Sequence, residues 1–200
     1  MLPIVTFEPV KEDSSDGQPL MRDIANGEWD AYFTEWATAA KANGKPMGFR
    51  FAQEMNGNWY SWSDGRFGNA SGDYVRAWRH LHDLFAEVGA DNLIWIWSVN
   101  RINNLPDKTL ARVYPGAKYV DWVGMSGYYR DEGVEPSFST TFDATLAEIE
   151  GDAIRLPMIE RRQDALTGIH LRGSLQRASR ARRPKKSICR CRGDLSSRGR

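Results

Sequence analysis

Strand-like and helix-like segments alternate along the first 150 residues, and this alternation predicts an α/β fold. Short apolar runs at residues 3–8, 47–52 and 92–100 have the length and composition of buried strands. Between them, residues 27–42 and 73–88 carry apolar side chains at helical spacing. Polar and aromatic residues follow the strand ends, which is where catalytic groups lie in a barrel of alternating strands and helices. The sequence therefore predicts part of a (β/α)8 barrel.

The two predicted helices have clear inner faces and clear ends. Residues 27–42 form an apolar stripe that stops at Asn43-Gly44, and the most economical role for Trp29 and Trp36 is packing against the barrel. Residues 73–88 place four large side chains on one face and stop at Gly89; they are Tyr74, Trp78, Leu81 and Phe85.

The pattern continues after the strand at 92–100. Residues 107–114 predict a short helical piece, residues 119–129 a strand, and residues 138–149 a helix. Leu156 to Glu160 has the start of a further strand. Five strands are therefore expected, whereas a complete (β/α)8 barrel takes about 250 residues and eight strands.

The segment Gly48–Trp62 combines one carboxylate with aromatic and amide side chains. The apolar run before it delivers Glu54 into a loop that contains Trp59, Tyr60 and Trp62. Sugars stack their C–H faces on aromatic rings and form hydrogen bonds to amides through their hydroxyl groups, so this composition suits a sugar ligand. Loss of solvent raises the pKa of a carboxylate, which a general acid requires. On the residues alone, a capping or ion-paired Glu54 in a Trp-rich core explains the segment equally well.

Arg50-Phe-Ala-Gln-Glu-Met-Asn-Gly-x-Trp resembles the fourth-strand signature of family-26 glycoside hydrolases, the β-mannanases and their relatives. The resemblance implies that Glu54 is the general acid/base. Gln53 stands where the family usually has His. The resemblance and the residue types together give the expected substrate-binding set: Arg50, Gln53, Asn56, Trp59, Trp62, Trp97, Asn100 and Tyr128.

By the same resemblance, the five expected strands correspond to strands three to seven of the family's barrel. Phe7-Glu8-Pro9 is similar to the Trp-Glu-Pro that ends the third strand in the family. The nucleophile is expected at the end of strand seven, where Glu160 is the one candidate. It comes two residues earlier than the family pattern, and Arg161-Arg162 follows it in place of the usual residues.

Composition divides the chain at about residue 160. Residues 1–150 carry 22 acidic and 13 basic side chains, whereas residues 151–200 carry 4 and 14, with no aromatic residue after Phe142. We expect a partial barrel domain at 1–160 and a disordered Arg-rich tail at 161–200. Such a tail is typical either of a nucleic-acid arm or of a GC-rich gene read in a shifted frame, and we favour the second.

The predicted function is retaining hydrolysis of β-1,4-mannan or a related β-glycan, with no cofactor. We expect a polysaccharide or oligosaccharide partner, no nucleic acid and no membrane, and no metal, because His80 and His82 cannot share a helix face. The family's polymer substrates imply an extracellular location, although no signal peptide precedes the first strand. Alternatives are a non-catalytic glycan-binding remnant and a β-1,3-1,4-glucanase. The pattern lacks strands one, two and eight and a well-placed nucleophile. The chain as written is therefore expected to show no mannan hydrolysis above background.

Overall fold

The computed structural model describes residues 1–10, 20–102, 109–128, 137–151 and 154. The chain divides into two units, Met1–Arg162 and Gln163–Arg200, and the second lies outside the described residues. The described elements therefore all belong to the first unit. The expected fifth strand at Leu156–Glu160 and the expected tail at 161–200 also fall outside the description.

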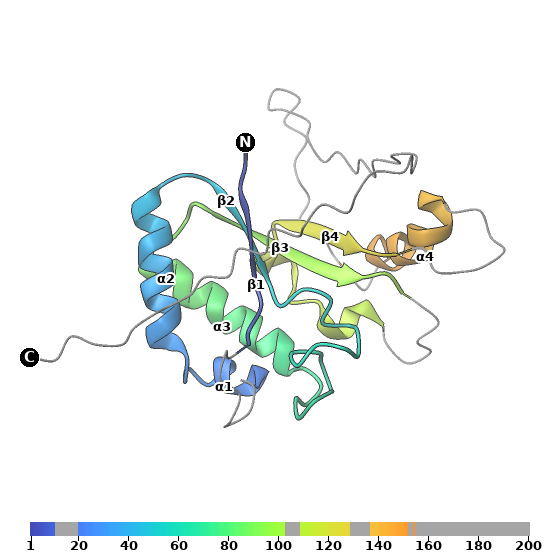
Figure 1. Cartoon of the computed structure of the whole chain (residues 1–200), viewed down its shortest axis with the longest axis horizontal. Helices are drawn as coiled ribbons and strands as arrows, with labels where there is room; N and C mark the ends of the chain where they lie inside the picture. Colours follow the sequence, from blue (N-terminus) through green and yellow to red (C-terminus); the bar gives the residue numbers. More distant parts are fainter. Residues whose placement is uncertain (11–19, 103–108, 129–136, 152–153, 155–200) are drawn as a thin grey trace, which may run out of the picture. The chain divides into compact units, whose positions relative to one another are not determined.

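Parallel strands and helices alternate along the first unit (Figure 1). In chain order the elements are β1 (Ile4–Phe7), α1 (Met21–Ala25), α2 (Asp30–Asn43), β2 (Met47–Phe51), α3 (Asp73–Val88), β3 (Leu93–Asn100), the 3-10 turns η1 (Leu110–Val113) and η2 (Ala117–Tyr119), β4 (Trp122–Ser126) and α4 (Phe138–Ile149).

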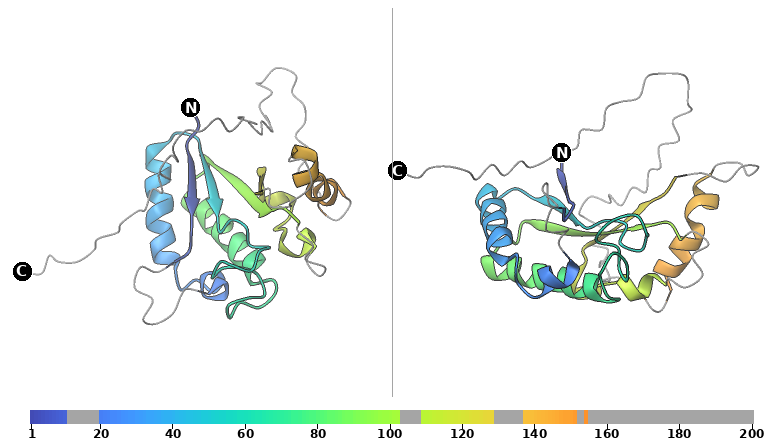
Figure 2. Two further views of the ribbon diagram at one scale, coloured as in Figure 1. Left: turned by 45° about the vertical axis from the view of Figure 1, so that its right-hand side comes forward. Right: turned by 60° about the horizontal axis from the view of Figure 1, so that its bottom comes forward.

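The four strands form one sheet in the order β1-β2-β3-β4, and every neighbouring pair is parallel. Helices α1, α2 and α3 lie along one face of this sheet (Figure 2). Consecutive parallel strands with helices on one face are the geometry of a (β/α)8 barrel wall, in which the other face points to the barrel interior. The predicted fold class is thus confirmed as a partial α/β barrel.

An aromatic core joins the sheet to its helices. Phe49 and Phe51 of β2 point toward the helices, because alternate residues of a strand face opposite sides. Trp36 of α2 packs on Phe49 with ring centroids 4.9 Å apart, and Phe85 of α3 packs on Phe49 at 5.4 Å. The four predicted inner residues of α3 are all buried. This packing fixes the position of β2, which leads into the site.

The opposite face of the sheet is also closely packed near its centre. A Cβ at Gly48 would lie 2.7 Å from Ile96 Cδ1 and 3.1 Å from Ile4 Cγ1. Glycine at this position therefore allows three neighbouring strands to approach. Arg50, two residues later, lies on the same face, so β2 carries this guanidinium on the interior side of the wall.

Several predicted boundaries differ in detail from the structure. The helix expected at 27–42 begins at Asp30, and α1 precedes it as a separate short helix. Of the strand expected at 119–129, the described residues form β4 at Trp122–Ser126, while Tyr119 ends the 3-10 turn η2. Helices α3 and α4 have the predicted bounds.

Candidate active site

The C-terminal strand ends meet at one edge of the sheet, as parallel pairing requires. The chain that leaves β2 stays hydrogen-bonded to both neighbours beyond the strand. Ala52 N–H donates to the Phe7 carbonyl of β1 at 2.9 Å, and Glu54 N–H donates to the Ser98 carbonyl of β3 at 2.8 Å. Glu54 is therefore anchored by its backbone between two strands.

The backbone turns sharply where it delivers Glu54. Ala52 and Glu54 have φ angles of 45° and 57°, in the left-handed region that non-glycine residues rarely adopt. Strain of this kind persists where surrounding bonds fix it, and it is concentrated at functional sites. Glu54 as a whole is 8% exposed. Its carboxylate makes no hydrogen bond or ion pair with the residues that the structure describes.

Arg50 lies beneath this turn on the interior face. Its guanidinium donates to Ser126 Oγ of β4 at 3.2 Å and lies 3.5 Å from Thr6 Oγ1 of β1, so it extends across the sheet. Burial lowers the pKa of Arg50, whereas the nearby charge of Glu54 opposes this shift most strongly among its neighbours. Arg50 thus stabilises negative charge at the strand ends.

Three further ionisable side chains act on Arg50 and mark the extent of the site. They are Tyr60, Glu8 and Tyr128, in order of decreasing influence. Glu8 follows β1 and Tyr128 follows β4, so residues of β1, β2 and β4, or of the segments directly after them, form one electrostatic cluster. Tyr128, the last described residue before a gap, is 63% exposed.

Aromatic side chains line the loop after Glu54. Trp59 is 45% exposed, and its ring lies so close to Gly57 that a Cβ there would be 2.6 Å from it. Tyr60 stacks on Trp62 with centroids 4.3 Å apart and an interplanar angle of 9°. Burial raises the pKa of Tyr60, with Glu54 and Glu8 adding to the effect. Trp59 therefore presents an apolar face beside a neutral phenol.

The two remaining indoles of the expected binding set are buried. Trp62 donates from Nε1 to the Gln53 carbonyl at 2.8 Å. Trp97 donates from Nε1 to the Val113 carbonyl at 3.0 Å. Neither ring offers a free face to a sugar in this structure, because Trp97 belongs to the core and Tyr60 covers Trp62. Their contacts support the walls of the site.

Asn56 and Asn100 form a reciprocal pair. The Asn56 amide donates to the Asn100 carbonyl at 2.8 Å and accepts from the Asn100 N–H at 2.9 Å. Both residues are buried. The Asn56 side chain therefore serves as a backbone clamp between the loop after β2 and the end of β3.

Gln53 is 4% exposed and points toward the end of β1. Its Nε2 donates to Glu8 Oε1 at 2.7 Å, a bond that joins the ends of β1 and β2. Sequence reasoning included Gln53 but left Glu8 out of the site. The Phe7-Glu8-Pro9 motif, which directly follows a strand, was the available signal.

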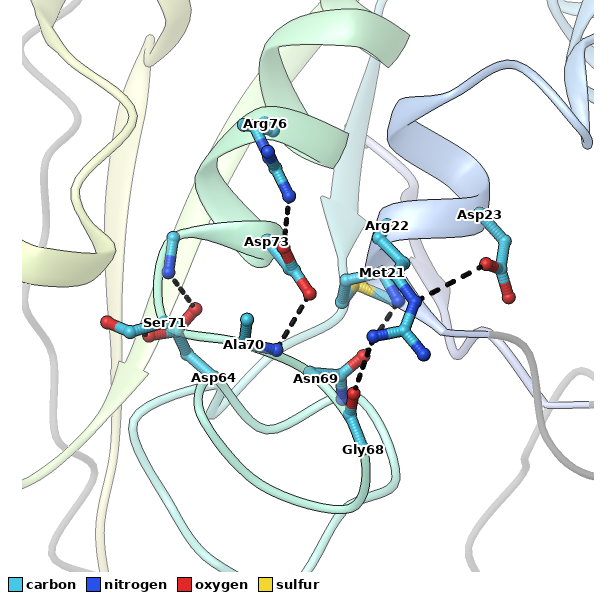
Figure 3. A network of polar contacts seen from close by, with 11 residues as sticks. Met21, Arg22, Asp23, Asp64, Gly68, Asn69, Ala70, Ser71, Asp73 and Arg76 are labelled. Atoms are coloured by element: carbon cyan, nitrogen blue, oxygen red, sulfur yellow. Dashed lines mark hydrogen bonds and ion pairs between the residues drawn. The ribbon is translucent and has the colours of Figure 1, made fainter.

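A polar network that the sequence did not predict holds the rest of this loop (Figure 3). Asn69 accepts from Met21 N–H of α1 at 2.8 Å and donates to the carbonyls of Ser61 and Arg66 at 2.8 and 3.0 Å. Arg22 of α1 donates to the Gly68 carbonyl at 3.1 Å. The short helix α1 is thus a brace for the loop that carries the aromatic residues.

Two buried carboxylates fix the junction of this loop with α3. Asp73 accepts from Ala70 N–H at 2.7 Å and pairs with Arg76 (Figure 3). Asp64 accepts from Gly72 N–H at 2.9 Å and from Ser71 Oγ at 3.3 Å. Burial raises the pKa of Asp64, and these hydrogen bonds partly oppose it.

A cleft of about 190 Å³ borders the loop just beyond Glu54. Its lining combines polar and cationic groups; the residues are Met55, Asn56, Asp64, Gly65, Arg66, Ser71, Thr109, Arg112 and Val113. Among the described residues, no group of three His, Cys, Asp or Glu side chains could hold a metal ion. No helix in the described part of the chain is long and apolar enough to cross a membrane.

Comparison with known proteins assigns this arrangement to a family. The sequence profile of glycosyl hydrolase family 26 matches residues 12–154, more than half of the chain. This protein belongs to glycosyl hydrolase family 26. The match spans both the turn that carries Glu54 and the loop braced by Asn69.

Two curated relatives illustrate the similarity in sequence. Endoglucanase H of Acetivibrio thermocellus is 36% identical over 127 residues, which cover 62% of this chain and 13% of that protein. Mannan endo-1,4-beta-mannosidase of Bacillus subtilis strain 168 is 34% identical over 93 residues, which cover 44% of this chain and 25% of that enzyme. The chain therefore matches a quarter or less of the length of these two relatives.

Solved structures confirm the fold. The Cellulomonas fimi endo-beta-1,4-mannanase double mutant superposes with a TM-score of 0.52 and 22% identity, covering 74% of this chain and 34% of that one. A beta-mannanase from a symbiotic protist of the termite Reticulitermes speratus, complexed with a gluco-manno-oligosaccharide, gives 0.50 and 19%, covering 70% and 44%. At this identity the likeness concerns the fold, which for this family-26 chain is part of the barrel.

Proposed function

We propose that this family-26 site takes part in retaining hydrolysis of β-1,4-mannan, with Glu54 as the general acid/base. The position of Glu54 carries the proposal. It lies at the C-terminal edge of the sheet on a strained turn, and its carboxylate, which has no hydrogen-bond partner among the described residues, lies near the guanidinium of Arg50. A carboxylic acid in this place can protonate a glycosidic oxygen and then, as a carboxylate, activate water.

Retaining hydrolysis needs a second carboxylate about 5–5.5 Å from the first, which attacks the anomeric carbon. Glu160 is our candidate, and it lies outside the described residues. Arg50 and Tyr128 would then stabilise negative charge on the nucleophile, because they reach the same edge of the sheet from β2 and β4.

The surroundings of Glu54 suit a polymer of neutral sugars. Trp59 supplies an exposed apolar ring for the C–H face of a sugar, and Tyr60 and Tyr128 supply hydroxyl groups. We keep Trp59, Tyr128, Arg50 and Gln53 as substrate-binding residues. Asn56, Trp62 and Trp97 act as supports of the site, while Asn100 is held by the clamp.

β-Glucan is a second candidate substrate, because the relative with 36% identity is named an endoglucanase. Mannose and glucose differ in the orientation of one hydroxyl group, so discrimination depends on the hydrogen bonds that a subsite offers. We favour mannan, since several relatives at about 30% identity are named mannan endo-1,4-beta-mannosidases. An extracellular location would accord with a polymeric substrate.

Binding and turnover on both polymers test the proposal. Mannopentaose and a mixed-linkage β-glucan pentasaccharide are titrated into the purified chain and its Trp59→Ala variant by calorimetry. We expect mannopentaose to bind more tightly, and Trp59→Ala to weaken binding about tenfold, as loss of a stacking ring does. Absence of binding to either sugar would contradict a glycan site.

Release of reducing ends from mannan is measured in parallel for the chain, Glu54→Gln and Glu160→Ala. Background turnover by the chain is the sequence-based expectation. Turnover that is lost in both variants would instead assign the acid and the nucleophile together.

A further inference from the structure

The cleft of about 190 Å³ beyond Glu54 combines apolar and cationic lining. Met55 and Val113 are its buried apolar residues. Arg66 of the loop and Arg112 of η1 are its exposed cationic residues. A closed cavity of about 150 Å³ holds a benzene ring, so this cleft has room for one six-membered sugar ring. Apolar walls with a few placed polar groups are the usual make-up of a small-ligand site.

Arg66 joins a fixed backbone to an uncommitted side chain. Its N–H donates to the Ser63 carbonyl at 3.2 Å. Its carbonyl accepts from the Asn69 N–H at 2.9 Å and from Asn69 Nδ2 at 3.0 Å. Its guanidinium makes no hydrogen bond or ion pair with the residues that the structure describes. Because the backbone is already ordered, a ligand of this guanidinium would meet a smaller entropy cost.

Asp64, the acidic residue of the lining, does not neutralise the arginines. Its carboxylate accepts from Gly72 N–H at 2.9 Å and from Ser71 Oγ at 3.3 Å, at the start of α3 (Figure 3). Within the described part of the chain, Asp64 forms no ion pair with either arginine. The cleft is therefore more basic than its surroundings, since residues 1–150 carry 22 acidic and 13 basic side chains.

We propose that this cleft binds a uronic acid carried by the β-glycan, with Arg66 and Arg112 as the ligands of its carboxylate. A planar guanidinium group can bind a carboxylate through two parallel N–H···O bonds, and this fit favours a uronic acid over a neutral sugar. The inference rests on the proposed glycan hydrolysis and names a substrate class for it. The uronic acid would lie near the cleaved bond, because Met55 and Asn56, which directly follow Glu54, line the cleft.

Two methyl glycosides that differ in one group test the preference for an acid. Methyl β-D-glucuronide and methyl β-D-glucoside are titrated into the full chain at constant ionic strength, with sodium acetate as a third ligand. The backbone amide signals of Gly65 and Thr109 are followed in ¹⁵N correlation spectra. We expect the glucuronide to move both signals and to bind about tenfold more tightly than the glucoside or acetate, as hydrogen bonds to a charged group allow.

Three results of this titration would overturn the inference. The first is that the glucuronide leaves the signals of Gly65 and Thr109 unmoved. The second is equal binding of the glucuronide and the glucoside, which would remove the preference for an acid. The third is acetate binding as tight as glucuronide binding, which would make the cleft a site for small anions only.

Charge variants assign the binding to the two arginines. Arg66→Gln and Arg112→Gln should each weaken glucuronide binding about 3–10-fold. Both side chains are exposed, so their replacement keeps the fold. Lys45→Gln removes one positive charge just before β2, at the opposite end of the strand, and should leave the affinity unchanged. Unchanged affinity in both arginine variants, or an equal loss in Lys45→Gln, would overturn the inference.

Titration of the parent chain with mannopentaose separates this inference from the proposed function. Binding of mannopentaose without binding of the glucuronide would overturn the inference and support the proposed function. Binding of the glucuronide without mannopentaose would contradict mannan as the substrate and support carboxylate recognition in the cleft.

Discussion

At the scale of single residues, the site depends on the close approach of the Gly57 backbone to the Trp59 ring. Gly57 leaves a flat surface on which the indole of Trp59 lies, and any side chain there would enter the space of the ring. Trp59 keeps nearly half of its surface exposed as a result. Its orientation, rather than its presence alone, makes it a platform for a sugar.

Gly57→Ala should therefore impair binding while the fold is kept. The added Cβ would lie 2.6 Å from the Trp59 ring, so the ring must move away. We expect mannopentaose affinity to fall by about tenfold, close to the loss in Trp59→Ala, with a change in Trp59 fluorescence. Asn58→Ala, at an exposed neighbour in the same loop, is the control. Unchanged affinity in Gly57→Ala would show that the ring position is unimportant.

At the scale of elements, the loop between β2 and α3 is a folded unit with its own buried polar core. Asn69 makes hydrogen bonds to four backbone groups, one in α1 and three within the loop. A loop held in this way can keep Glu54 and Trp59 in place without regular secondary structure. The short helix α1 owes its position to the same asparagine.

Asn69→Ala should lower the free energy of unfolding by about 2–4 kcal/mol, because buried backbone groups lose their partners. Urea denaturation followed by tryptophan fluorescence measures the change. Asn58→Ala serves again as the control, with an expected effect within about 0.5 kcal/mol. A similarly small effect for Asn69→Ala would mean that water or other side chains replace its bonds.

Regular elements were predictable because their signals are local. Hydrophobic spacing and the C-terminal glycines gave the bounds of α3, and the strand runs gave the order of the sheet. The short helix α1 (Met21–Ala25), which precedes the helix expected at 27–42, was not predicted, since its position depends on the distant Asn69. Within the site, the approach of Glu54, Arg50 and Tyr128 follows from parallel strands sharing an edge.

Side-chain pairing was not predictable in the same way. The composition of the loop shows that Asn56, Trp62 and Trp97 are present, but not which backbone groups they bind. Each of these side chains donates a hydrogen bond to a backbone carbonyl 9 to 44 residues away in the sequence. The importance of Glu8 likewise appears only when β1 is placed beside β2.

At the scale of the whole molecule, the buried carboxyl of Asp64 links stability to pH. Burial raises its pKa above the ordinary value of 3.8, so the folded chain binds this proton more tightly than the unfolded chain does. The contribution of Asp64 to stability is complete below pH 3.8 and is lost as the pH rises through the raised pKa.

Asp64→Asn should remove this dependence. The amide keeps an acceptor for Gly72 N–H and carries no charge, so we expect an unfolding free energy near neutral pH that is equal to or higher than that of the parent. Urea denaturation over a pH series, with Asp83→Asn at an exposed position of α3 as control, measures the difference between the two profiles. An identical slope in Asp64→Asn and the parent would assign the pH dependence to other groups.

The central claim is that Glu54 is a general acid/base, and a hybrid barrel tests it most directly. Residues 2–149 replace the structurally equivalent segment of the Cellulomonas fimi endo-beta-1,4-mannanase, and Glu54→Gln is introduced into the hybrid. We predict that kcat on mannan falls about 10²–10⁴-fold, and far less on an aryl mannoside whose leaving group needs no proton. Mannan hydrolysis by the Glu54→Gln hybrid at the rate of its parent would contradict the account.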